Sequence, residues 1–505
     1  MLKTEPVQSS SSSTDSFTWR DKRYKQFYQI VDQLVDEIQA NLKAKDGRAV
    51  RRLGNAGLPN LAYSVECIIR DCVSVVYVRK RVGKAVIRLG KHQYPADRPD
   101  KMLTYRMHIE RAFQGLKQLG YVEITDKGIY DRQGLKNGQS KSRLTRYVAT
   151  DKLMELFGDF EPTAISACIP NYQDPELLKV RIKERDATGV KRTVRVAFDE
   201  TDDTRSMVER IKIINKALSK HWYDLEISDP DLISLQKRLA DDPETDKVLR
   251  FDRRSVYRVF NDASFSMGGR FYGGWWQNVP RKYRKQIIFN GKPTVELDYS
   301  NQHPTILYAW EGVTRPADCY SNVIRLNYLP EGTTRKDLRD MVKAAFNAML
   351  NSNKMLRNAP DGVEPWLYGL KWSELRDAIM SFHTPVEHHF FTGVGLRLQK
   401  TDSDIAERVM LHFATKGIAI LPLHDSFLMH HGYESELRDV MDTAFEEVTG
   451  YKAKIDVKEK SLVVVNDDTD MDLPDFDSEF SEILELLRSG HEKRLNAFRS
   501  LALEK

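Results

Sequence analysis

Two apolar segments far apart in the sequence each deliver an aspartate, and this pair constrains the fold more than any other feature. Residues 293–297 alternate in the way of a buried strand, which places Asp298 at the strand's exit. Residues 417–423 form a second apolar segment, and a third follows directly after His424-Asp425-Ser. His424 and Asp425 are therefore expected at the tip of a hairpin. A lone aspartate in such a place is usually a cap or turn residue, so only the pair is informative.

A helix is predicted between the two aspartates, from residue 334 to residue 350. Side chains four residues apart share one side of a helix. The residues on that side are Arg335, Arg339, Lys343 and Asn347. Apolar positions around the rest of the helix are Leu338, Met341, Ala345 and Met349. A basic stripe alone is most often a solvated face, but this one lies between two candidate carboxylates in the sequence.

Strand-borne carboxylates and a cationic helix are together what a nucleotidyl-transfer site requires. Asp298 and Asp425 would hold two Mg²⁺ ions roughly 3.5–4 Å apart, and Mn²⁺ is an alternative ion. Arg339 and Lys343 would bind the triphosphate of a nucleoside triphosphate through charge-assisted hydrogen bonds. The residues therefore predict an enzyme that makes nucleic acid.

These segments resemble the palm and fingers of family A DNA polymerases and of single-subunit phage-type RNA polymerases. Asp298-Tyr-Ser resembles motif A of these enzymes, and Arg339-x-x-x-Lys343 resembles motif B. His424-Asp425-Ser-Phe resembles motif C. The resemblance implies a right-hand polymerase of the α+β class, with palm, fingers and a reduced thumb.

Two further segments extend the resemblance in the expected order. Gly269-Arg270, followed by Gln277-Asn-Val-Pro, is similar to the stretch that leads into motif A. Gln399-x-Thr-x-x-Asp404 is similar to the glutamine helix that precedes motif C. Trp275 and the tryptophan after it, with the basic residues that follow, fit either base stacking or a place in the core.

The resemblance implies three sets of site residues. Metal ions would be bound by Asp298, Asp425 and the backbone carbonyl of Tyr299. The nucleotide would contact Arg339, Lys343, Tyr299, Tyr320, His303 and Asn347. The primer and template would contact Arg270, Gln277, Gln399 and His424.

Several positions depart from the pattern of the DNA polymerases. His303 stands where those enzymes carry the glutamate that excludes a ribose 2′-hydroxyl. Asn347 and Asn351 stand at the aromatic and tyrosine positions of the motif B helix, and Ser426 follows the motif C aspartate. The choice of sugar stays open, because the loss of the acidic gate favours ribonucleotides while Asp-Tyr-Ser and Gln-Asn-Val-Pro favour DNA synthesis.

The N-terminal part is predicted to bind DNA. A helix over residues 102–119 ends at Gly120, a strand covers residues 121–125, and a basic loop at 134–141 leads into a return strand at 143–149. This order resembles a winged helix. The basic residues that would meet DNA are Arg106, Arg111, Lys117, Lys141, Arg143 and Arg146. The alternative is a small helix-hairpin domain with a solvated basic face.

Five regions are expected along the 505 residues. They are a disordered tail (1–18), a winged-helix-like DNA-binding region (19–158), a connecting or thumb-like region (159–262), the palm and fingers (263–465), and an acidic linker with a C-terminal helix (466–505). Four cysteines without a Cys-x-x-Cys pair favour a reducing compartment. No signal peptide and no apolar run of about 18 residues are seen, so a cytoplasmic protein without a membrane partner is expected.

The combined prediction is a DNA-dependent DNA polymerase, or a primase-polymerase, that replicates a mobile element. Its partners would be a primer and template, nucleoside triphosphates, and an origin duplex bound by the winged helix. One alternative is a single-subunit RNA polymerase whose winged helix finds a promoter. Another is a non-catalytic replication initiator on a degenerate palm, against which the intact Asp298, Arg339, Lys343 and Asp425 argue.

Overall fold

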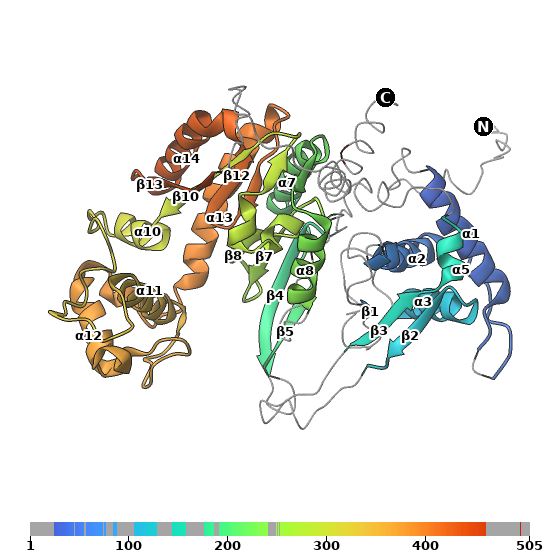
Figure 1. Cartoon of the computed structure of the whole chain (residues 1–505), viewed down its shortest axis with the longest axis horizontal. Coiled ribbons are helices and arrows are strands. Elements are labelled where there is room, and N and C mark those ends of the chain that lie inside the picture. The colour runs from blue at the N-terminus through green and yellow to red at the C-terminus, as the bar shows by residue number, and fades with distance from the viewer. Residues whose placement is uncertain are drawn as a thin grey trace, which may run out of the picture.

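The computed structural model describes a mixed α/β protein with two hydrophobic cores (Figure 1). It describes residues 25–157 except 45, 55–56, 74, 77–83, 88–105 and 129–143, residues 176–460 except 186–190, 241–248, 250 and 252, and residue 495. The expected tail at 1–18, the basic loop at 134–141 and almost all of the region 466–505 lie outside these residues.

The described part of the N-terminal core is built from four helices and a small antiparallel sheet. The elements are α1 (Lys25–Asn41), α2 (Leu58–Val73), β1 (Ala85–Ile87), α3 (Arg106–Gln118), β2 (Val122–Asp126), β3 (Thr145–Ala149) and α5 (Asp151–Glu155), and the strand order is β1-β3-β2. Helix α3 packs closely on α1, because a Cβ on Gly115 would lie 2.7 Å from the Ile38 side chain. Gly120 has a positive φ of 78° directly after α3, as expected of a helix end. The predicted helix and its two strands are confirmed where the structure describes them.

Strands between residues 178 and 272 form a four-stranded sheet with both parallel and antiparallel pairs. It has the order β5-β4-β7-β8 and comprises β4 (Leu178–Arg185), β5 (Lys191–Val196), β7 (Tyr257–Asn261) and β8 (Ser264–Tyr272). Strands β4 and β5 pair as an antiparallel hairpin, and the helices α7 (Asp202–Ser219) and α8 (Asp229–Ala240) follow it in the chain. The domain boundary expected at residue 262 falls in the β7–β8 hairpin, and one core continues from Leu178 to Phe445. Residues 176–262 therefore pack as part of the larger unit.

A four-stranded antiparallel sheet carries the two aspartates. Its order is β11-β12-β10-β13, from β10 (Thr294–Ser300), β11 (Leu421–Leu423), β12 (Ser426–His430) and β13 (Lys454–Lys460). Asp298 lies within β10, because the strand pairs with β12 and β13 on its two sides as far as Asp298 and Ser300 respectively. The expected strand at 417–423 is shorter than predicted, since only its last three residues pair with β12. Two helices, α13 (Gly395–Thr415) and α14 (Glu434–Thr449), pack together beside this sheet.

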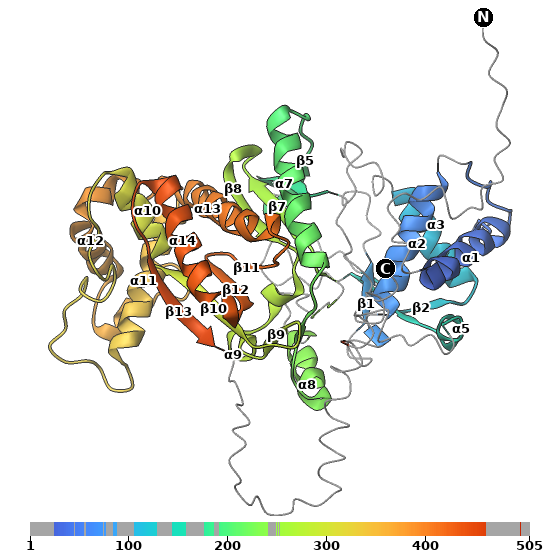
Figure 2. The ribbon, with the colours of Figure 1, turned by 90° about the horizontal axis from the view of Figure 1, so that it is seen from above.

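The predicted basic helix is confirmed as α11 (Arg335–Asn351). Thr334 caps its first turn, and Asp337 returns the hydrogen bond to complete a capping box. The expected apolar positions at Leu338, Met341, Ala345 and Met349 are buried. Near α11 in Figure 1 are α10 (Gln302–Trp310) and α12 (Trp372–Phe382), and this group stands far from the N-terminal unit. Figure 2 shows the same separation from above.

Trp222 links the two cores. It directly precedes β6 (Tyr223–Leu225), whose residues lie in the larger core, but its own side chain is buried in the N-terminal core. The guanidinium of Arg254 lies 4.6 Å from the Trp222 ring. No helix in the described part of the chain is both long and apolar enough to cross a membrane.

Candidate active site

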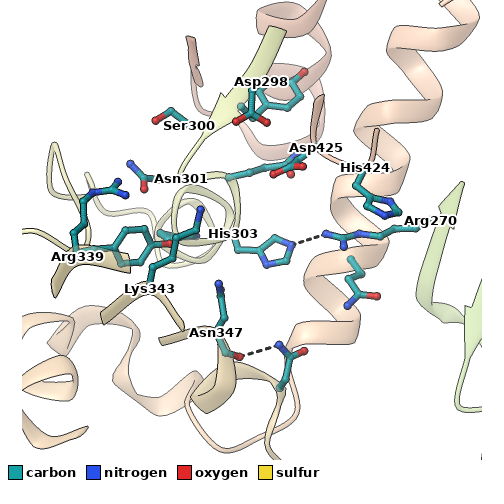
Figure 3. Close-up of a pocket in the computed structure, with 16 residues that line it drawn as sticks. Arg270, Asp298, Ser300, Asn301, His303, Arg339, Lys343, Asn347, His424 and Asp425 are labelled. Carbon is teal, nitrogen blue, oxygen red and sulfur yellow. Dashed lines mark hydrogen bonds between the residues drawn. The ribbon is translucent and has the colours of Figure 1, made fainter. Parts of the chain in front are cut away.

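A cavity of about 480 Å³ lies where the sheet with the aspartates faces α11 and α13 (Figure 3). Most of the predicted metal, nucleotide and primer residues line it: Arg270, Asp298, Tyr299, His303, Tyr320, Arg339, Lys343, Asn347, Gln399, His424 and Asp425. They come from segments spread over residues 270–425. The fold therefore brings together residues that were selected from short separate motifs.

Asp298 and Asp425 lie close together at one side of this cavity. Asp425 belongs to the two-residue turn between β11 and β12, and its carbonyl accepts a hydrogen bond from the Tyr299 amide at 3.2 Å. Burial and repulsion from Asp425 raise the pKa of Asp298 to about 6, although Lys458 opposes the change. Two carboxylates in this arrangement favour a cation between them.

The hairpin turn that presents Asp425 has a strained backbone. His424 has a φ of 67°, a left-handed conformation that a residue with a side chain adopts at a cost. Its ring lines the cavity, and burial together with the charge of Arg270 lowers the pKa of His424. The lowered pKa favours the neutral form of the ring. Contact of His424 with the primer stays a prediction.

A lysine and a buried glutamate adjoin Asp298, and the motifs identified neither of them. The β10–β13 register shifts between Glu296 and Leu297, so that Lys458 is the extra residue of a β-bulge. Its Nζ lies 3.3 Å from Asp298 Oδ1 and 3.8 Å from Glu296 Oε1. Glu296 is 1% exposed and accepts a hydrogen bond from Ser426 Oγ at 2.9 Å. This bulge brings a cation to the two carboxylates of β10.

The donor set fits hard divalent cations such as Mg²⁺. Carboxylate oxygens are the ligands that Mg²⁺ and Mn²⁺ prefer, and an added cation would offset the charge that raises the pKa of Asp298. Tyr299 can offer only backbone groups to the cavity, because its ring is buried and its hydroxyl donates to the Met441 carbonyl at 2.7 Å. The ligand role of its carbonyl stays a prediction.

The cations of α11 lie across the cavity from the carboxylates (Figure 3). Arg339 is held by Asp318, whose Oδ2 accepts from Arg339 Nε at 3.0 Å. Burial alone would raise the pKa of Asp318. Hydrogen bonds from the Ser321 and Tyr320 amides and from Arg339 have the larger combined effect and lower this pKa to about 2. The Arg339 guanidinium also lies 5.2 Å from the Tyr320 ring. Lys343 forms no ion pair with any residue that the structure describes, so its ammonium group is free to meet an anion.

His303 is positioned by a buried aspartate that the sequence did not reveal. Its Nε2 lies 3.0 Å from Asp402 Oδ2 on α13, and Asp402 is 1% exposed. Arg270 clamps the same carboxylate, donating from Nε at 3.1 Å and from a terminal nitrogen. The same Nε2 also lies 3.3 Å from a terminal nitrogen of Arg270, so Asp402 and Arg270 together fix the orientation of the His303 ring. Arg270 is thus tied to the protein before any nucleic acid binds.

Two asparagines, which the sequence already showed to depart from the motif B pattern, lie towards the end of α11. Asn351 Nδ2 donates to the Asn347 carbonyl at 2.8 Å, and both residues line the cavity. A Cβ on Gly395 would lie 2.0 Å from Asn351 Oδ1, so a side chain at this position would displace the Asn351 amide where α13 approaches α11. Gln399 follows one turn later on α13 and faces the cavity. Small polar groups therefore replace an aromatic surface at this wall.

Gln277 and the adjacent tryptophans lie outside the cavity. The amide of Gln277 donates to the carbonyls of Phe271 and Pro422 at 3.0 and 3.2 Å. Trp275 and Trp276 are 1% and 0% exposed, and Trp276 Nε1 donates to the Pro422 carbonyl at 2.9 Å. The core interpretation of the tryptophans is correct and base stacking on them is excluded. Contact of Gln277 with nucleic acid stays a prediction, although its amide already has internal partners.

Only part of the predicted N-terminal interface can be placed. Lys141, Arg143 and the side chain of Arg106 lie outside what the structure describes. Arg111 donates to the Arg51 carbonyl, so it fastens α3 to the segment before α2. The two remaining basic residues, Lys117 on α3 and Arg146 on β3, are exposed to solvent.

No protein-family model matches this sequence, and no curated protein is significantly similar to it. Among solved structures, the chain aligns with the POL domain of Pol1 from M. smegmatis in complex with DNA primer-template and dNTP. The alignment covers 86% of this chain and 81% of that chain, at 12% sequence identity and a TM-score of 0.31. At that TM-score it establishes no common fold.

Proposed function

We propose that this protein is a template-directed nucleotidyltransferase, a DNA-dependent DNA polymerase of the family A kind. One observation carries the proposal. Asp298 and Asp425 converge from neighbouring strands of one sheet, and the basic residues Arg339 and Lys343 of α11 face them across a cavity large enough for a nucleotide. Carboxylates for metal ions opposite cations for phosphates are what this reaction needs.

Different residues of the chain would bind the metal ions and the triphosphate. When bound at Asp298 and Asp425, two Mg²⁺ ions would activate the attacking hydroxyl and offset the charge of the leaving pyrophosphate. Lys343 binds the triphosphate as a free point charge, whereas Arg339 binds it from a position already fixed by Asp318. Lys458 holds Asp298 in place from the neighbouring strand. These contacts orient the triphosphate with little further loss of freedom.

The sugar site is proposed to tolerate ribonucleotides. His303 lines the cavity, and the ring nitrogen that Asp402 does not contact can accept or donate a hydrogen bond. A ribose 2′-hydroxyl can both donate and accept, so it can pair with this nitrogen, whereas a buried glutamate would reject it. This observation also favours a second candidate function, synthesis of RNA by a single-subunit RNA polymerase or of primers by a primase-polymerase.

The N-terminal unit is proposed to bind duplex DNA as a winged helix and to recruit the enzyme to an origin, as in replication of a mobile element. The order of its elements, helix-helix-strand-helix-strand-strand with sheet order β1-β3-β2, supports this proposal. The exposed Lys117 and Arg146 supply charge for phosphates. A non-catalytic initiator would have no need for the site around Asp298 and Lys343.

Separate incubations with primed and unprimed single-stranded DNA, each with dNTPs or with NTPs, test the proposal. The proposed function predicts primer extension that depends on template sequence and on Mg²⁺ or Mn²⁺. Products from unprimed template would identify a primase-polymerase. No incorporation under any of the four conditions would reject catalysis and favour the initiator.

A further inference from the structure

Two adjacent histidines, His388 and His389, contact the carboxylate of Glu311. Glu311 lies at the C-terminal end of α10, and the cavity lies at the other end of this helix. His389 Nε2 lies 2.8 Å from Glu311 Oε1, and His388 Nε2 lies 3.2 Å from the same oxygen. One ligand atom from each residue can be chosen so that all three lie within 4.8 Å of one another. Glu311 caps the C-terminal end of α10, and the histidines end the 3-10 helix η7 (Thr384–His389).

The backbone around these histidines is fixed by the fold. His383 at the start of η7 is fully buried and contacts Tyr308 of α10 at 3.0 Å and the Cys319 carbonyl at 2.9 Å. Just after η7, the Phe391 amide donates to the Met349 carbonyl at the end of α11 at 2.8 Å. Phe391 has a φ of 62°, a strained value for a bulky residue. The pair of histidines is thus presented by a segment that is anchored on both sides.

We propose that Glu311, His388 and His389 form a site for a divalent transition metal such as Zn²⁺. Two imidazole nitrogens and one carboxylate oxygen are an established donor set for Zn²⁺, with bonds of about 2.0–2.2 Å. Tetrahedral bonds of that length place ligand atoms roughly 3.3 Å apart, close to the 2.8 and 3.2 Å found here. His388 is 58% exposed, so a water molecule can reach the fourth position.

A second histidine–glutamate contact in the same fold serves as a comparison. His412 Nε2 lies 3.1 Å from Glu436 Oε1, but the third group there is Lys416, whose Nζ is 2.6 Å from the same oxygen. That arrangement is an ordinary ion-pair cluster, because a lysine ammonium cannot ligate a metal. Glu311 forms ion pairs only with the two histidines among the residues that the structure describes. All three groups of this cluster, the Glu311 carboxylate and the two imidazoles, can therefore ligate a metal ion.

A metal ion at this site would fasten α10 to η7. The N-terminal end of α10 carries His303 in the cavity, and its C-terminal end carries Glu311. η7 connects α12 to the segment that enters α13, which carries Gln399 and Asp402. The site would brace two walls of the cavity from outside. It is also chemically distinct from the aspartate pair, since imidazole ligands favour Zn²⁺ or Co²⁺ over Mg²⁺.

Titration of the metal-free full-length protein with Zn²⁺ by calorimetry, and with Co²⁺ by visible absorption, tests the proposal. Excess Mg²⁺ is present throughout to occupy oxygen-only sites. We expect one Co²⁺ ion per chain with the intense bands of tetrahedral coordination, and a higher Tm with Zn²⁺. His388→Ala and Glu311→Gln should each weaken binding at least about tenfold, the lower range for disturbing a metal's ligand environment.

His412→Ala is the matched control, because it removes an exposed histidine from the comparison cluster and should leave Co²⁺ binding unchanged. His388 is largely exposed, so its replacement is not expected to disturb folding. Unchanged Co²⁺ spectra and affinity in His388→Ala would overturn the proposal. Absence of tetrahedral bands in the wild-type protein would overturn it as well.

Discussion

The substitution Asp298→Asn should stabilise the metal-free protein at alkaline pH. The pKa of Asp298 is raised from 3.8 to about 6, so the folded state disfavours the ionised carboxylate relative to the unfolded state. This destabilisation is absent below pH 3.8, grows as the pH rises towards 6, and is complete above it. At about 1.4 kcal/mol for each tenfold change in proton affinity, it amounts to about 3 kcal/mol at pH 8 and about 1 kcal/mol at pH 4.5. The side chain is 22% exposed, so screening by solvent is limited.

Urea unfolding in EDTA at pH 8 and pH 4.5 measures this effect. The Asp298→Asn protein should gain roughly 2 kcal/mol more at pH 8 than at pH 4.5. Asp361→Asn is the control, because Asp361 is exposed and does not line the cavity, and it should change stability little at either pH. An Asp298→Asn protein that is no more stable than wild type at pH 8 would refute the reasoning that burial and Asp425 act against the ionised carboxylate.

Three further predictions address the nucleotide, the sugar and the DNA. Lys343→Ala should raise the nucleotide KM and slow incorporation in steady-state assays, because a contact to the triphosphate is lost, and unchanged nucleotide dependence would remove Lys343 from the site. The wild-type enzyme should prefer dNTPs over NTPs by less than about a hundredfold, or roughly 2.7 kcal/mol, and His303→Glu should increase that preference in single-nucleotide incorporation. A wild-type preference above about ten-thousandfold would make His303 itself a strict gate. Lys117→Glu with Arg146→Glu should weaken duplex binding in gel-shift titrations while primer extension persists, and unchanged binding would exclude this face.

Local patterns were sufficient to predict the elements that carry the aspartates and the cations. Helix α11 has the bounds expected from its four-residue spacing, since both its cap at Thr334 and its buried face are encoded in adjacent residues. The turn at His424 and Asp425 was predictable because apolar strands flank it. These segments meet at one cavity because β10 pairs with β12 in the sheet. The motifs implied this strand order but did not establish it.

The partners of the site residues could not be predicted, because they depend on tertiary contacts. Asp402 meets His303 from a helix almost a hundred positions away, and nothing in its local sequence distinguishes it from a solvated aspartate. Lys458 reaches Asp298 only through a β-bulge, which shifts the register of β13 by one residue. Trp275 and its neighbour were ambiguous for the opposite reason, since aromatic residues beside basic ones are equally typical of a core edge and of a nucleic-acid surface.

The most direct test of the account is nucleotide incorporation by Asp298→Ala and Asp425→Ala on a primed DNA template with Mg²⁺. Each substitution should abolish incorporation, because each removes a ligand for both metal ions. DNA binding, measured by fluorescence anisotropy on the same template, should stay within about twofold of wild type, because most affinity comes from phosphate contacts elsewhere. Incorporation at more than about a tenth of the wild-type rate in either variant would contradict the assignment of this cavity as the catalytic site.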